Sequence, residues 1–183
     1  RWYTCFVFVL CVFKRKAAYG IAACLVGSEK CRRDSRWWVG ASRRTVISMI
    51  ELERDDTVFV LTMTDDENRW NTTFVREFAK ALDEVEASEG AAALVTLSAH
   101  DKFFSNGLDL EWISTQGEHR GGNRVPFGAE FMELMGRFIT LPVPTIAAVN
   151  GHAFGAGFMC ALSHDVRLMR EDRGYLCANE LQI

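Results

Sequence analysis

Apolar residues between residue 49 and the last residue follow two alternating patterns. Short continuous apolar runs are typical of strands buried on both faces, whereas apolar residues three or four positions apart mark one face of a helix. Strands are predicted at residues 57–64, 91–98, 145–151, 166–171 and 174–180.

Helices are predicted in the gaps between these strands. The side chain of Asn71 can cap a helix whose apolar face is Phe74, Phe78, Leu82 and Val85. A second helix has Phe131, Leu134, Met135 and Phe138 at helical spacing, and residues 155–165 predict a short buried helix. Strands and helices therefore alternate, which predicts an α/β fold.

The first 48 residues differ in composition from the rest of the chain. They hold 10 Lys and Arg against 2 Asp and Glu, a balance of +8, whereas residues 49–183 hold 11 against 22, a balance of −11. They also carry four of the six cysteines. We therefore predict that residues 1–48 are an appendage, disordered or artefactual, and that 49–183 form the domain. The closing "NELQI" has no helix stop signal, which predicts a domain cut short at its C-terminal end.

Charge, cysteine spacing and hydropathy exclude several classes of function. An acidic domain gives no electrostatic reason to expect a nucleic-acid partner. The apolar run of residues 2–13 is too short to span a bilayer, so no membrane span is predicted. The chain has no Cys-x-x-Cys pair or Cys/His cluster, and no metal site is predicted.

Two glycine-containing turns are the strongest candidates for chemistry. In "KFFSNGLDL", residues 102–110, Gly107 permits a sharp bend that presents the N–H of Leu108. In "NGHAFGAGFMCALSHD", residues 150–165, Gly155-Ala156-Gly157 opens an apolar helix whose first amides have no partner within it. Either turn alone is best interpreted as an ordinary turn, but two amides that converge on one oxygen would form an oxyanion hole.

Neither turn fits the better-known glycine motifs. Their glycine spacings match neither a dinucleotide-binding fingerprint nor a phosphate-binding loop, and the chain has no Gly-x-Ser-x-Gly nucleophile elbow. Three nearby polar residues are interpreted as structural. Asp109 is predicted to cap a short helix through Trp112, and His164 and Asp165 to hold the strand that follows them.

The two turns in this order resemble the crotonase (enoyl-CoA hydratase/isomerase) superfamily. "LPVPTIAAVNGHAFGAG", "CALSHDVRLM" and "GYLCANELQI" extend the resemblance from about Met49 to the last residue. It implies a crotonase-like ββα spiral, with the amides of Leu108 and Ala156 holding the thioester oxygen of a fatty acyl-CoA. The residues expected around the substrate are Lys102, Ser105, Asn106, Gly107, Gly155 and Met159.

Departures from the family pattern narrow the expected chemistry. Hydratases of this superfamily carry two catalytic glutamates; the first position is Met159 here, and the second matches Glu180. A single carboxylate suits proton shuttling, so the resemblance is closest to the peroxisomal or plant-like Δ3,Δ2-enoyl-CoA isomerases of fatty acid β-oxidation. Two alternatives stay open: another crotonase-type hydratase or lyase, and a catalytically inactive CoA-binding fragment.

The resemblance also sets expectations for cofactors, assembly and location. It implies no nicotinamide, flavin or metal, because coenzyme A is part of the substrate. It implies a homotrimer for the full-length form, and a cytoplasmic or peroxisomal location.

Overall fold

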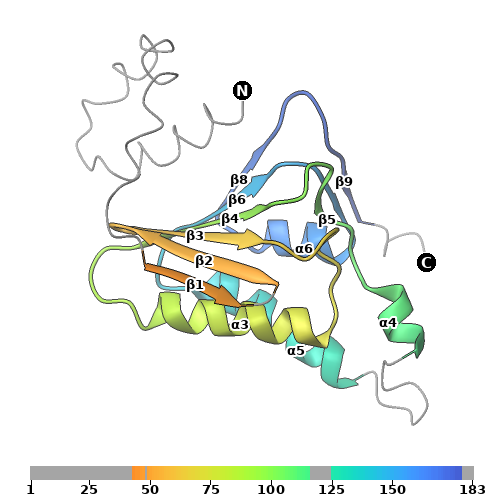
Figure 1. Cartoon of the computed structure of the whole chain (residues 1–183), viewed down its shortest axis with the longest axis horizontal. Helices are drawn as coiled ribbons and strands as arrows, with labels where there is room; N and C mark the ends of the chain where they lie inside the picture. Colours follow the sequence, from red (N-terminus) through yellow and green to blue (C-terminus); the bar gives the residue numbers. More distant parts are fainter. Residues whose placement is uncertain (1–42, 48, 116–124, 179–183) are drawn as a thin grey trace.

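Two β-sheets organise the part of the chain that the computed structural model describes, residues 43–47, 49–115 and 125–178 (Figure 1). The larger sheet has six strands in the order β1-β2-β3-β4-β6-β8, and the smaller has three in the order β5-β7-β9. The strands of the larger sheet are β1 (Arg43–Ile47), β2 (Ile50–Asp55), β3 (Val58–Met63), β4 (Ala93–Ser98), β6 (Thr145–Val149) and β8 (Val166–Met169). Those of the smaller sheet are β5 (Phe103–Ser105), β7 (His152–Phe154) and β9 (Leu176–Cys177).

The strands are distributed between the sheets in a regular way. The first three strands pair antiparallel, whereas β3-β4, β4-β6 and β6-β8 pair parallel. Each of β4, β6 and β8 is followed by one strand of the smaller sheet, whose pairs are also parallel. The chain therefore forms a spiral in which each coil adds one strand to both sheets.

One strand of the larger sheet lies before the predicted domain start at residue 49. Residues 43–47, predicted to belong to the appendage, form β1 and pair antiparallel with β2 from Arg43 opposite Arg54 to Ile47 opposite Ile50. Residues 1–42 and 48, the rest of the predicted appendage, lie outside the described residues.

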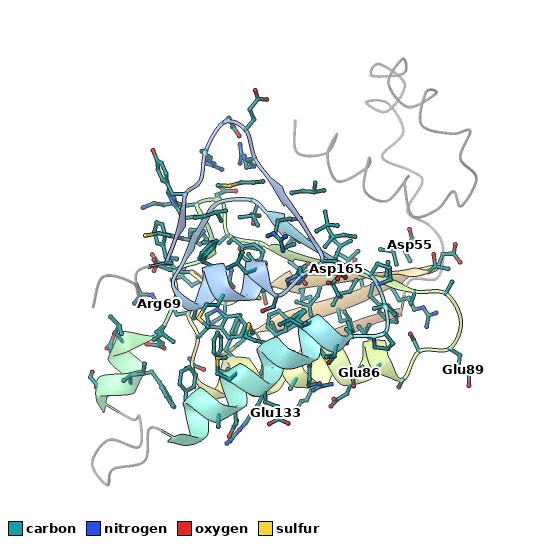
Figure 2. All side chains as sticks on the ribbon, turned by 180° about the vertical axis from the view of Figure 1, so that it is seen from behind. Asp55, Arg69, Glu86, Glu89, Glu133 and Asp165 are labelled. Carbon is teal, nitrogen blue, oxygen red and sulfur yellow. The ribbon has the colours of Figure 1, made fainter. Side chains whose placement is uncertain are left out.

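Four helices complete the described fold: α3 (Thr72–Glu86), α4 (Leu110–Thr115), α5 (Val125–Thr140) and α6 (Ala156–Leu162). The predicted cap of α3 is confirmed, because the Asn71 side chain accepts a hydrogen bond of 2.9 Å from the N–H of Phe74. Arg137 on α5 forms ion pairs with Asp83 at 2.7 Å and Glu86 at 3.0 Å, which join α5 to α3. Figure 2 labels Glu86 on α3 and Glu133 on α5, both of which are exposed.

The main core lies between the larger sheet and the helices. The predicted apolar faces of α3 and α5 are confirmed, because all eight of their named residues are buried there. Trp70, fully buried ahead of α3, has its ring centroid 4.9 Å from Phe74, 5.4 Å from Phe78 and 5.1 Å from Phe131. This aromatic cluster fixes the loop that enters α3.

His164 and Asp165 follow α6, and their side chains bond to β4 and β6 rather than to the strand after them, β8. The His164 ring donates from Nδ1 to Cys160 O at 2.8 Å, which leaves Nε2 to accept from Thr96 Oγ1 at 2.9 Å. Asp165 (labelled in Figure 2) accepts hydrogen bonds from the N–H of Thr145 at 2.8 Å and from its hydroxyl at 2.9 Å. These bonds join the end of α6 to β4 and β6.

The buried His164 should make stability depend on pH. Burial lowers its pKa from 6.5 to about 4, so the unfolded chain binds more protons than the folded one between these values. We expect the contribution of His164 to the free energy of unfolding to be constant above pH 6.5. As the pH drops to 4, this contribution should make the free energy of unfolding fall by about 3 kcal/mol. Urea unfolding across this range should show a flatter profile for His164→Gln. An equal slope of the free energy of unfolding against pH in both proteins would contradict the assignment of this effect to His164.

Candidate functional site

The first predicted turn connects β5 to α4. Gly107 has φ +84°, in the left-handed region that favours glycine. Its carbonyl accepts from the N–H of Trp70 at 2.8 Å, and the N–H of Asp109 donates to Trp70 O at 3.0 Å. Because these two bonds flank Leu108 in a parallel bridge, the N–H of Leu108 points away from Trp70. The side chain of Asp109 accepts from the N–H of Trp112 at 2.9 Å, which confirms the predicted cap.

The second predicted turn connects β7 to α6. Gly155 has φ 49° and precedes the first helical residue, Ala156. The N–H of Gly155 donates to Cys177 O at 2.9 Å, whereas its carbonyl accepts from the N–H of Met159 at 3.0 Å. The N–H of Ala156 belongs to the first turn of α6 and has no acceptor within the helix.

The structure brings these two turns together. They follow β5 and β7, which are neighbouring parallel strands. A Cβ atom built on Gly107 would lie 3.0 Å from Phe154 O and 4.0 Å from Ala156 N. Gly107, Leu108, Gly155 and Ala156 therefore occupy one place in the fold.

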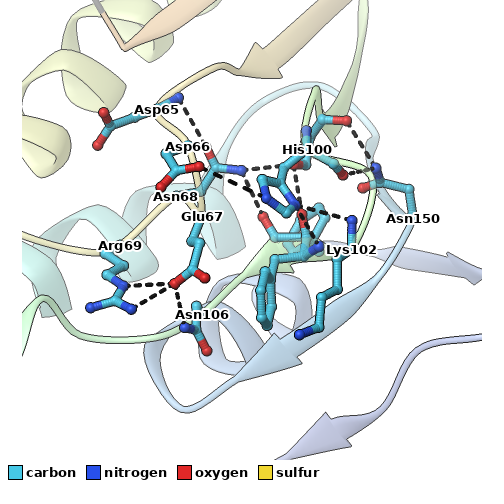
Figure 3. Close-up of polar contacts among 12 residues, drawn as sticks. Asp65, Asp66, Glu67, Asn68, Arg69, His100, Lys102, Asn106 and Asn150 are labelled. Atoms are coloured by element: carbon cyan, nitrogen blue, oxygen red, sulfur yellow. Dashed lines mark hydrogen bonds and ion pairs between the residues drawn. The ribbon is translucent and has the colours of Figure 1, made fainter.

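Two residues predicted to lie around a substrate have protein partners there. The side chain of Ser105 is fully buried, and its hydroxyl forms hydrogen bonds only within the protein. Asn106 donates from its side chain to Glu67 Oε2 at 2.7 Å and from its backbone to Glu67 O at 2.9 Å (Figure 3). Hydrogen bonds from Arg69 and Asn106 lower the pKa of the Glu67 carboxyl, which favours its charged form.

The remaining predicted site residues lie at different distances from the turns. Met159 is half-buried, one helical turn after Gly155, and packs against the main core. Lys102 lies at the opposite end of β5 from Gly107, with its Nζ 4.8 Å from the ring centroid of Phe103. The structure therefore does not bring Lys102 to the two turns. Glu180 lies outside the described residues.

Sequence reasoning missed the loop that supports the first turn. Asn68 is fully buried with φ 53°, and its side chain donates to Ser98 Oγ at 2.7 Å and to Phe104 O at 3.1 Å (Figure 3). His100 accepts at Nδ1 from the backbone N–H groups of Lys102 and of Phe103, the first residue of β5. The stretch "DDENRWN", residues 65–71, is rich in Asn and Asp, and this turn signal could have identified the loop.

The described residues offer neither a metal-binding cluster nor a membrane-spanning helix. They contain no group of three or more His, Cys, Asp or Glu side chains placed to hold a metal ion. No helix among them is both long enough and apolar enough to cross a membrane.

The chain matches a known protein family over most of its length. The family model described as enoyl-CoA hydratase/isomerase matches residues 53–183. Enoyl-CoA delta isomerase 2, peroxisomal, of Arabidopsis thaliana is 39% identical over 138 residues, covering 74% of this chain and 58% of that protein. Enoyl-CoA delta isomerase 3 of the same organism is 36% identical, covering 74% and 57%. A putative enoyl-CoA hydratase of Thermus thermophilus is 33% identical, covering 68% and 49%. The chain thus spans about half to three-fifths of these relatives.

Solved structures confirm the expected fold. An enoyl-CoA hydratase from Bacillus anthracis superposes with a TM-score of 0.65 at 22% identity, covering 74% of this chain and 53% of that one. An enoyl-CoA hydratase/isomerase from Xanthobacter autotrophicus Py2 superposes with a TM-score of 0.63 at 28% identity, covering 70% and 48%. The described spiral is therefore the crotonase fold.

Proposed function

The chain belongs to the enoyl-CoA hydratase/isomerase family, and from this premise we propose that it acts as a Δ3,Δ2-enoyl-CoA isomerase on fatty acyl-CoA. The names of the Arabidopsis relatives support the choice of reaction. The observation that carries the proposal is the meeting of the two turns, with the Cβ position of Gly107 4.0 Å from Ala156 N.

The spacing of the two amides suits a shared oxygen. Donors that each lie about 3 Å from one oxygen can be no more than about 6 Å apart. Leu108 and Ala156 follow β5 and β7, and neighbouring strands lie about 4.8 Å apart. This strand spacing supports the proposal that adjacent coils of the spiral supply the two donors, without any side chain.

The proposed chemistry moves one proton and one double bond. A base removes a proton from the α carbon of the 3-enoyl thioester, and the electron pair passes to the thioester oxygen, where the N–H groups of Leu108 and Ala156 stabilise the negative charge. The same base returns the proton to the γ carbon, and the double bond becomes conjugated with the thioester. The step is redox-neutral and needs no metal or other cofactor.

Glu180 is the proposed base. The N–H of Gly155 donates to Cys177 O, so the chain at residue 177 lies beside the second turn. Glu180 follows Cys177 by only three residues, and this short separation along the chain supports its choice as the base. The half-buried Met159 offers an apolar wall, and its thioether cannot activate water as a second carboxylate would.

Substrate, assembly and location form part of the same proposal. A fatty acyl-CoA substrate fits the family, and two Arabidopsis relatives are named peroxisomal, which supports that compartment over the cytoplasm. We propose that the full-length protein assembles as a homotrimer, the state that the family resemblance implies.

The purified chain should convert 3-enoyl-CoA to 2-enoyl-CoA, followed by the ultraviolet absorbance of the conjugated thioester. Water addition to 2-enoyl-CoA, measured as 3-hydroxyacyl-CoA formation, should be negligible because Met159 is not a carboxylate. Hydration faster than isomerisation would favour the hydratase alternative. Thioester binding without either reaction would show a CoA-binding protein and overturn the proposal.

A further inference from the structure

The hydroxyl of Ser105 is the centre of a buried hydrogen-bond network at the first turn. It donates to Asn68 O at 2.7 Å and accepts from the Trp70 indole N–H at 3.0 Å and the Gly107 N–H at 3.3 Å. A hydroxyl has one hydrogen to donate and two lone pairs to accept with. All three are used within the protein, so this side chain has no capacity left for a substrate.

These partners connect the turn to the aromatic cluster of the core. Asn68 and Trp70 precede α3, and the Trp70 ring is held in the aromatic cluster of the core. Gly107 is the residue before the proposed donor Leu108. The hydroxyl therefore connects the backbone beside one donor directly to the fixed indole.

Ser105 also contacts the segment that carries the other donor. A Cβ atom on Gly157 would lie 2.5 Å from Ser105 Cβ and 2.6 Å from Ser105 Oγ, so α6 packs directly against this serine. Gly157 is the residue after Ala156. Ser105 thus contacts one chain neighbour of each proposed donor, namely Gly107 beside Leu108 and Gly157 beside Ala156.

We infer that Ser105 is a positioning residue, which sets the distance between the Leu108 and Ala156 amides without contacting the substrate. The inference rests on the proposed function, because it assigns a purpose to the placement of these two amides. Misplacement of catalytic groups by about 1 Å can cost roughly a hundredfold in rate. Binding of the acyl chain and CoA should depend much less on this hydroxyl.

The test compares Ser105→Ala with Ser88→Ala in the full chain. Ser88 is a suitable control because its hydroxyl donates a hydrogen bond to Val85 O at 2.7 Å, at the end of α3 and away from both turns. We expect Ser105→Ala to lower kcat for isomerisation by about 10- to 100-fold, with KM changed less than about threefold. Ser88→Ala should change neither constant.

Two further measurements do not depend on activity. In the Ser105→Ala variant, the NMR signal of the Trp70 indole N–H should shift, because it loses its acceptor. Hydrogen exchange at the Asp109 amide, bonded to Trp70 O, should become faster. Ser88→Ala should leave both unchanged.

The outcomes separate the inference from the proposed function. A wild-type chain that does not isomerise 3-enoyl-CoA overturns the proposed function, and the exchange data then decide the inference alone. Unchanged kcat in an active Ser105→Ala variant overturns the inference, as does unchanged exchange at Asp109. A rise in KM with kcat unchanged would mean that Ser105 contributes to binding, and would also overturn it.

Discussion

Replacing Gly157 with alanine should destabilise the fold more than the same replacement at the glycines of α5. The new Cβ would lie 2.5 Å from Ser105 Cβ and 2.8 Å from Ser105 O. The second of these atoms is backbone, so β5 or α6 must move. Overpacking of this kind typically costs about 1–3 kcal/mol, and we expect the upper end of that range.

Gly136→Ala is the matched control for Gly157→Ala. Gly136 lies in α5, and its Cβ position has no heavy atom within 4 Å. Alanine is the better helix former, so this variant should gain up to about 1 kcal/mol. Urea unfolding of the two variants beside the wild type measures both effects. A Gly157→Ala variant with an unchanged unfolding midpoint would show that β5 and α6 are not in tight contact.

The second large effect is expected from Glu180→Gln. If Glu180 is the only base, the amide variant cannot take up the α proton, and isomerisation should fall by about a thousandfold or more. Binding of a saturated acyl-CoA, measured by calorimetry, should change little because the two backbone donors remain. Glu171→Gln changes an exposed carboxylate on the loop before β9 and should leave the rate unchanged. A Glu180→Gln variant with near-normal activity would assign the proton transfer to another residue.

The longer elements were predictable because their patterns extend over several turns or a whole strand. The face of α3 with its Asn71 cap, the buried face of α5 and the strand at 91–98, observed as Ala93–Ser98, all follow from local sequence. The resemblance to a family added the spiral, which the solved structures confirm.

Short or edge elements were not predictable in the same way. β5 and β7 have three residues each, too few to establish a period, so neither strand was predicted. The two residues of β9 lie within the strand predicted at 174–180. β1 was not predicted because its sequence, "RRTVI", is short and starts with two basic residues. Edge strands often carry such charged residues.

In the candidate site too, local features were predictable from the sequence and tertiary contacts were not. The two turns were identifiable because glycine and the residues around it determine the backbone conformation locally. The role of Ser105 was not, because it depends on Asn68, Trp70 and Gly157, which only the tertiary fold brings together. A serine at this position suggested a hydroxyl available to a ligand. In the fold, Ser105 is buried and its hydroxyl bonds to protein atoms instead.

The stacked coils also determine where the chain can change in length. At one corner of the spiral, the N–H of His152 donates to Lys102 O at 2.8 Å, and Asn150 Nδ2 donates to Ser98 O at 2.9 Å, so corners of successive coils are bonded to each other. The link between α3 and β4, residues 87–92, is mostly exposed instead. An inserted residue in that link would lengthen a surface loop. The same insertion at residues 150–151 would shift β7 against β5 by about 3.3 Å and carry Ala156 away from Leu108. Evolution and protein engineering alike can therefore lengthen this fold between coils, but not at the corners that keep them in register.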